Sequence, residues 1–250
     1  MNIIKNSKKV LLPLVLGALF AGNVMAGNPE TAVDLGFAGD FTILSKSGIT
    51  DVFPSVVKGS VGSSPITGAA IHLECTEIDA EVQVYSVDAA GPSCKTTDAT
   101  KLTGAIGAME IAYTDAAGRV NPDETELGAG EIGSLTLAPG LYKWSSSVGI
   151  SNDVYLDAKN DKGAVWIFQI AGDLLQASSS SVLFTDGVGE ARNVFWQVAG
   201  GVTIGTGATF NGVILSKTLI AVQTDAIVNG RLFAQTAVTL QMNQVTAPAP

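Results

Sequence analysis

The fold of this chain is decided by two consecutive segments, IGTGATFNGVILSKTLIA at residues 204–221 and VQTDAIVNGRLFAQTAVT at residues 222–239. Asn211-Gly212 in the first segment recurs as Asn229-Gly230 in the second, at an offset of 18 residues (from 211 to 229). Short apolar runs that repeat at a fixed period, with turn residues between them, indicate stacked units. A period of this length accommodates three short strands and three corners, which is one coil of a β-helix.

An Asn-Gly pair also favours a two-residue β-hairpin turn, so a hairpin remains an alternative. We favour solenoid corners because both pairs occupy the same phase of the repeat. A further match joins residues 168–172 (FQIAG) to residues 196–200 (WQVAG) at a longer offset, which predicts coils with insertions at one corner.

Aligning the coils predicts one inward column of branched aliphatic residues and a second column two residues further on. The first column is Val148, Leu174, Val202, Ile220 and Val238, and the second is Ile150, Gln176, Ile204, Val222 and Leu240. Side chains between the columns should point outward, because strand residues alternate between faces. These outward residues, and those at the corner before the strand, are small and mostly uncharged, which is unusual for a protein surface.

Two regions interrupt this pattern. Residues 43–46 (ILSK) are identical to residues 214–217, so one coil should form early in the chain and pack among the later ones. From Asp98 to Gly118, Leu102, Ile106, Met109, Tyr113 and Ala116 recur at three- and four-residue steps, which predicts one helix. Thr97 or Asp98 is suited to cap its first turn.

The overall composition excludes several classes of protein. The chain has 250 residues, 46% of them hydrophobic, with 14 Lys and Arg, 23 Asp and Glu, and a net charge of -9. It is too apolar to be disordered and too acidic for a nucleic-acid binder. With one His and two Cys, it does not supply the usual multi-His or thiolate metal sites, and we expect no metal and no cofactor.

Residues 1–26 are predicted to be a secretory signal peptide. Lys5, Lys8 and Lys9 precede an apolar run, and Val24-Met25-Ala26 has the form of a cleavage site. The apolar run is too short for a membrane anchor, so the mature protein should be secreted, extracellular or periplasmic, with no membrane association. Export also favours a disulfide between Cys75 and Cys94.

Catalysis is disfavoured, and we expect no catalytic residues. The only local concentration of carboxylates is Asp153, Asp157, Asp161 and Asp173, and the first three of these fit one corner loop. A neutral face of threonines repeating at the strand spacing of about 4.7–4.9 Å would instead suit an uncharged crystalline solid such as ice. A structural or adhesive solenoid that binds polysaccharide or a cell surface is the alternative, with Trp144, Trp166 and Trp196 as candidate aromatic platforms.

The chain resembles the β-helical ice-binding protein family of cold-adapted bacteria, fungi and algae, from about Ala32 to about Thr246. The matching landmarks include FTILSKSGIT (41–50), SPITG (64–68), AYTDAAGR (112–119), LAPGLY (137–142), VWIFQIAG (165–172) and NGRLFAQTAVTL (229–240). The resemblance implies a mainly β fold, a discontinuous right-handed triangular β-helix with one long helix alongside. It also implies adsorption to ice, giving thermal hysteresis and inhibition of ice recrystallisation.

The family's T-A/G-x-T/N pattern maps onto residues 236–239 and, in relaxed form, onto residues 47–50. Other coils depart from the pattern. The predicted ice-contacting residues are Ser47, Thr50, Thr203, Thr218, Thr236 and Thr239. The predicted organisation is a signal peptide (1–26), an ice-binding β-helix domain (27–246) with a capping insertion plus helix at about 72–119, and a flexible tail (247–250). We expect a monomer whose partner is the ice surface.

Overall fold

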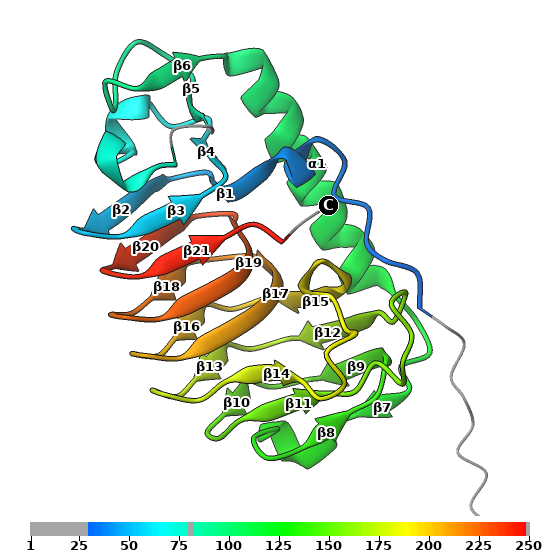
Figure 1. The fold of residues 1–250 in the computed structure, drawn as a ribbon. Helices are drawn as coiled ribbons and strands as arrows, with labels where there is room; N and C mark the ends of the chain where they lie inside the picture. Colours follow the sequence, from blue (N-terminus) through cyan, green and yellow to red (C-terminus); the bar gives the residue numbers. More distant parts are fainter. Residues whose placement is uncertain (1–29, 80–82, 249–250) are drawn as a thin grey trace, which may run out of the picture.

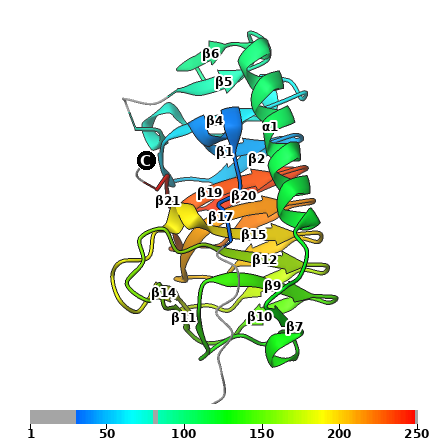
Figure 2. The same ribbon diagram turned by 90° about the vertical axis from the view of Figure 1, so that its right-hand side faces the viewer.

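The computed structural model describes residues 30–79 and 83–248. The predicted signal peptide lies outside the described residues. Within them the chain forms three parallel β-sheets that enclose a triangular interior, with one long helix along the outside (Figures 1 and 2). Every strand pairing in the described part of the chain is parallel, as expected for a β-helix.

The largest sheet, called the long sheet, has twelve strands. In spatial order its main path is β6 (Lys95–Thr97), β5 (Val84–Ser86), β4 (Ser60–Ser63), β1 (Phe41–Ser45), β19 (Ile227–Ala234), β17 (Thr209–Ser216), β15 (Val194–Val198), β12 (Trp166–Ile170), β9 (Gly140–Trp144) and β7 (Glu124–Thr125). Two further strands, β21 (Gln244–Thr246) and β3 (Val56–Lys58), join it through β19.

The second sheet, called the six-stranded sheet, is made of one short strand from each coil. Its order is β10 (Val148–Ile150), β13 (Leu174–Gln176), β16 (Val202–Ile204), β18 (Ile220–Val222), β20 (Ala237–Gln241) and β2 (Gly48–Val52). The third sheet contains β14 (Val182–Phe184), β11 (Val154–Leu156) and β8 (Thr136–Leu137).

The repeat predicted from the sequence sets which residues pair across neighbouring coils. Asn211 pairs with Asn229 and Ile214 with Leu232, so the 18-residue offset is one coil, and Phe168 pairs with Trp196 across a longer coil. The two Asn-Gly pairs lie inside β17 and β19 rather than in hairpin turns. At Gly230 an added Cβ would lie 1.9 Å from the Gly212 carbonyl oxygen, so this glycine allows the coils to approach closely.

The β-helix is discontinuous, as predicted. The early strands β1, β2 and β3 pair with the late strands β19, β20 and β21, so the first coil stacks on the last one. Beyond it, residues 60–97, called the cap, extend the stack through β4, β5 and β6. Helix α1 (Ala99–Gly118) then runs along the long sheet toward the opposite end, where the remaining coils begin (Figure 1).

The predicted inward columns fill the core inside the triangle. Val148, Leu174, Val202, Ile220 and Val238 are in register and almost fully buried. Aromatic rings stack beside them, and the ring centroids of Phe168 and Trp196 are 4.0 Å apart. The core is therefore one continuous column of side chains contributed by successive coils.

A second core lies between α1 and the outer surface of the long sheet. The predicted apolar face of the helix supplies Leu102, Met109 and Ala116, all fully buried. Asp98 caps the helix, because its side chain accepts a hydrogen bond from the Lys101 backbone N–H, and the helix ends at Gly118. Five short 3-10 turns complete the described elements: η1 (Gly36–Asp40), η2 (Gly68–Ala70), η3 (Cys75–Glu77), η4 (Leu127–Gly130) and η5 (Ala191–Asn193).

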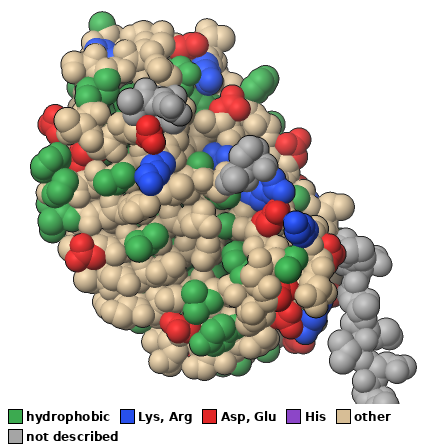
Figure 3. Space-filling view, viewed as in Figure 1, with side chains coloured by type: hydrophobic (Ala, Val, Ile, Leu, Met, Phe, Trp, Pro, Cys, Tyr) green, Lys and Arg blue, Asp and Glu red, His purple; other side chains and the backbone are tan. Residues whose placement is uncertain are grey.

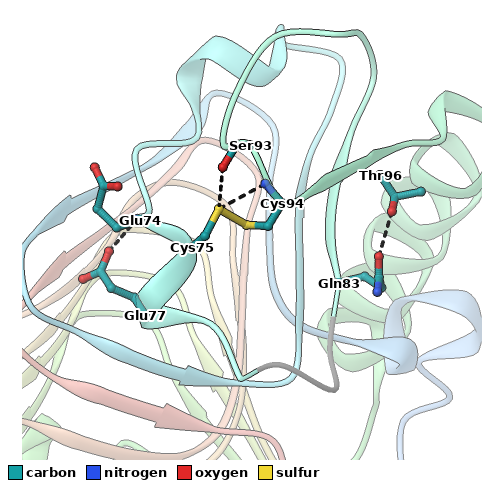
Figure 4. The surroundings of a disulfide bond; sticks show 7 residues. All are labelled: Glu74, Cys75, Glu77, Gln83, Ser93, Cys94 and Thr96. Atoms are coloured by element: carbon teal, nitrogen blue, oxygen red, sulfur yellow. Dashed lines mark hydrogen bonds between the residues drawn. A yellow bond between two sulfur atoms is a disulfide. The ribbon is translucent and has the colours of Figure 1, made fainter.

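The disulfide between Cys75 and Cys94 is confirmed, with 5.8 Å between the two Cα atoms. It joins η3 to the loop before β6 and so closes the cap on itself (Figure 4). The cap overlaps the predicted capping insertion plus helix at about 72–119, whose bounds stay a prediction.

The first two residues of the predicted tail (247–250) are held against the β-helix. The Ala247 backbone N–H donates to the Lys58 carbonyl, and Pro248 is buried. Residues 249–250 lie outside the described part of the chain. In residues 30–79 and 83–248, no helix is both long and apolar enough to cross a bilayer.

Candidate functional site

The outer surface of the six-stranded sheet is the candidate site. Its strands alternate between buried residues that enter the core and accessible residues that face outward, as in Val202–Thr203–Ile204. Strand pairing aligns the outward residues of all six strands in one row, the central row: Gly149, Leu175, Thr203, Ala221, Thr239 and Thr50.

Three of the six predicted contact residues lie in this central row. Thr239 pairs directly with Thr50, and Thr203 is separated from Thr239 by Ala221 alone. Thr50 is exposed, whereas Thr203 and Thr239 are half-buried. Neighbouring strands in a sheet are about 4.8 Å apart, so these side chains follow a regular spacing.

The other three predicted residues lie at the corner where the chain passes from the long sheet to the six-stranded sheet. Ser47 and Thr236 are adjacent there, because the Ser47 backbone N–H donates to the Thr236 carbonyl at 2.8 Å. Thr218 occupies the equivalent position one coil away, and its backbone N–H donates to the Ser216 hydroxyl at 3.2 Å. The structure thus brings all six predicted residues to one face.

Glycine shapes this corner at the end of the face. Gly48 has a φ of 125°, a conformation that side-chain-bearing residues rarely adopt. An added Cβ at Gly48 would also lie 2.8 Å from the Ala70 carbonyl oxygen. Gly48 therefore lets the first coil and the cap stack closely beside Ser47 and Thr50.

Three residues on this face depart from the predicted surface of small, uncharged side chains. Leu175 in the central row is 51% exposed, and Leu219, one residue before β18, is 40% exposed. Asp173 lies just before β13 and carries a charge. The sequence already departs from the T-A/G-x-T/N pattern at these positions, in residues 172–175 and 218–221, but it does not predict how far each side chain is exposed.

The outer surface of the six-stranded sheet differs from the neighbouring face in its charged side chains. Figure 3 views the side of the molecule formed by β3, β21, β14 and β11, where Lys, Arg, Asp and Glu side chains are scattered. The six-stranded sheet has three outward rows. They are the central row, the row two residues before it in each strand and the row two residues after it. In these rows Asp173 is the one charged side chain.

The residues that would support the alternative functions lie in the core or on other parts of the surface. Trp144, Trp166 and Trp196 are at most 1% exposed and belong to the core, so they form no aromatic platform. Asp153 accepts a hydrogen bond from the Ser181 backbone N–H and Asp157 pairs with Lys159, on separate parts of the surface from Asp173. In the described ranges, no group of three or more His, Cys, Asp or Glu is arranged to hold a metal ion.

A buried polar cluster lies where β2 meets the cap. The Ser55 hydroxyl donates to Asp51 Oδ1 at 2.6 Å, and the Ser55 backbone N–H donates to Glu77 Oε1 at 2.6 Å. Burial raises the pKa of Asp51 to about 6, and the neighbouring Glu77 carboxyl contributes to the rise. The sequence pattern does not predict this cluster, because Asp51 and Glu77 belong to different coils.

Comparison with known proteins agrees with this geometry. Residues 43–246 match the sequence profile of the ice-binding-like family. The chain belongs to that family. It is 59% identical to an ice-binding protein of Colwellia sp over 248 residues, which cover 99% of this chain and 96% of the relative. It is 53% identical to an ice-binding protein of Flavobacterium frigoris, over 89% of this chain and 79% of the relative.

Solved structures of ice-binding proteins have the same fold. The antifreeze protein LeIBP from an Arctic yeast superposes with a TM-score of 0.80 at 37% identity, over 88% of this chain and 96% of that one. This chain and that protein thus share the architecture although nearly two thirds of their aligned residues differ. The family resemblance and the fold predicted from the sequence are both confirmed.

Proposed function

We propose that this protein adsorbs to ice through the outer surface of the six-stranded sheet, with Ser47, Thr50, Thr203, Thr218, Thr236 and Thr239 as contact residues. The observation that carries the proposal is the register of this sheet, which aligns three of these residues in the central row and places the other three at its corner. Family membership supports ice as the ligand.

Threonine suits this surface because its hydroxyl forms hydrogen bonds with water while its methyl group is apolar. On a rigid sheet the side chains hold a fixed spacing, and β-branched residues have few rotamers to lose on binding. An array of this kind orders water in a pattern that merges with the ice lattice. Adsorbed molecules then pin the growing ice front, giving thermal hysteresis and inhibition of recrystallisation.

The experiment compares three forms of the predicted mature chain, residues 27–250. The test form carries Thr236→Tyr and Thr239→Tyr, which disrupt the face without entering the core. The control form carries Thr136→Tyr and Thr209→Tyr, on accessible positions of the neighbouring face. We expect the wild type and the control to show thermal hysteresis and recrystallisation inhibition, and the test form to lose most of both, with the same circular dichroism spectrum in all three.

Two results would contradict the proposal in different ways. Full activity of the Thr236/Thr239 variant would move the ice-binding surface elsewhere on the molecule. Inactivity of a folded wild type would overturn ice binding itself and promote a polysaccharide-binding solenoid.

We also propose that the protein works outside the cytoplasm, as a monomer, without catalysis and without a cofactor. Removal of the predicted signal peptide would shift the net charge from -9 to -12, because Lys5, Lys8 and Lys9 leave with it. This negative charge disfavours nucleic acid as a partner. Light scattering of the purified protein tests the monomer, and a dimer mass would refute it.

A further inference from the structure

Asp173 lies in an unusual place for a charged residue. It immediately precedes β13, and its carbonyl accepts the Val148 backbone N–H of β10 at 2.8 Å. On the other side of β13, the Leu174 backbone N–H donates to the Gly201 carbonyl at 2.9 Å. Asp173 thus lies in the outward row two residues before the central row. On one side of it β13 pairs with β10, and on the other side β13 pairs with β16.

The Asp173 side chain is held along the surface of the sheet. Its Oδ1 accepts a hydrogen bond from the Gly201 backbone N–H at 2.7 Å, and its backbone N–H donates to the Ser147 hydroxyl at 3.0 Å. The carboxylate covers the next coil, because an added Cβ at Gly200 would lie 2.1 Å from Oδ1. The corner position in this next coil is accordingly Gly200, where the following coils have Thr218 and Thr236.

A fixed carboxylate opposes adsorption to a neutral crystal. Its accessible oxygen retains strongly bound water, and removing that water costs far more than desolvating a hydroxyl or a methyl group. No Lys or Arg occupies the outward rows of the six-stranded sheet in the part of the chain that the structure describes, so no cation on the face offsets this cost.

We propose that Asp173 limits the ice-adsorbing area, confining it to the part of the face that β16, β18, β20 and β2 form. The sheet continues without a break through β13 and β10, and their residues Ser147, Gly149 and Leu175 are uncharged. This part of the face has the chemistry to join the contact, and the carboxylate holds it away from the ice. The inference rests on the proposed function of the same face.

The first test replaces Asp173 by Asn, which keeps an oxygen for the Gly201 N–H and removes the charge. Asp153→Asn is a matched control, because Asp153 Oδ1 accepts the Ser181 backbone N–H of the next coil at 2.8 Å, at the start of β11 and away from the face. If adsorption follows the contact area, Asp173→Asn raises thermal hysteresis by about 1.5-fold, the ratio of six strands to four. Asp153→Asn leaves it unchanged.

The second test locates the added area with Leu175→Tyr. In the wild type this substitution lies outside the contact and leaves thermal hysteresis unchanged. In the Asp173→Asn background it abolishes the gain. Thr203→Tyr, on the other side of Asp173, lowers the activity in both backgrounds.

Each failure has a distinct meaning. Equal or lower activity of Asp173→Asn, with wild-type activity intact, overturns the boundary and leaves the proposed function standing. Loss of activity on Leu175→Tyr alone also overturns it, because β13 then already contacts ice. Inactivity of the folded wild type would remove the proposed function itself.

Discussion

At the scale of single residues, Asp51 and Glu77 place two carboxyl groups together at the join between β2 and the cap. Glu77 is 3% exposed and accepts the backbone N–H groups of Ser55 and Glu74. Asn243, one coil away, donates its backbone N–H to the Ser55 hydroxyl at 3.2 Å. The cluster therefore links the first coil, the last coil and the cap.

The raised pKa of Asp51 makes this join sensitive to pH. The folded-state pKa of about 6 lies above the ordinary value of 3.8, so the folded protein binds the Asp51 proton more tightly than the unfolded chain. The stabilisation is complete below the ordinary value and is lost as pH rises through about 6. We expect the thermal unfolding temperature to fall between about pH 4 and about pH 6.5.

Asp51→Asn should flatten this part of the profile, because an amide stays neutral over the range. Asp225→Asn is the control, since Asp225 is exposed, and it should retain the wild-type slope. A wild-type unfolding temperature that does not change with pH would contradict the prediction. So would an Asp51→Asn variant that keeps the slope.

The positions of the six predicted contact residues could be inferred from the sequence. In a stacked fold, residues at the same phase of the repeat lie side by side on one surface. Once Thr218 and Thr236 are aligned, their positions on the corner follow from the period. Asp51 and Glu77 could not be found in this way. Their contact depends on how the irregular cap folds onto the first coil, and no periodicity describes that region.

At the scale of elements, α1 combines a buried face that the sequence predicted with two glycines that weaken it. Gly104 faces Phe37, whose ring an added Cβ would approach at 3.7 Å. Gly107 has open space, with nothing within 4 Å of an added Cβ. The apolar spacing was enough to predict the helix, but it did not distinguish these two glycines.

Gly107→Ala should stabilise the protein by about 1 kcal/mol, because alanine favours a helix interior more than glycine does. Chemical denaturation monitored by circular dichroism measures the change. Gly62→Ala is the opposite case, since its Cβ would lie 2.4 Å from Leu102 Cδ2 under the helix, and it should destabilise. A destabilising Gly107→Ala would mean that this side of α1 is covered in solution.

At the scale of the whole molecule, each end of the stack has its own termination. At the end beyond the first coil, the disulfide-linked cap covers the open strands. At the other end, carboxylates accept N–H groups that a further coil would otherwise occupy: Asp123 from Leu141, Glu126 from Ser145 and Glu131 from Ser151. Hydrogen bonding to Ser145 lowers the pKa of Glu126, which keeps it ionised. Both devices protect the sheet edges from pairing with another chain.

Replacing both cysteines by serine should destabilise the protein by about 3 kcal/mol, as expected for a loop of this length. The midpoint of denaturation should fall, and the wild type in a reducing buffer should behave like the variant. Ice activity in the cold should persist, because four of the six proposed contact residues, Thr203, Thr218, Thr236 and Thr239, lie on coils away from the cap. An unchanged midpoint would show that the cap is held by its packing alone.

The pairing of β1 with β19 also sets the order in which the molecule forms. These strands are neighbours in space but lie near opposite ends of the described chain. Contacts of such high contact order form late and slowly. The middle coils pair with coils that are adjacent in sequence, so they can pair as soon as both have been synthesised. In contrast, β1, β2 and β3 cannot pair with their partners until the final coil has formed. A chain crossing a membrane N-terminus first would thus carry its first coil unpaired until the last one had emerged.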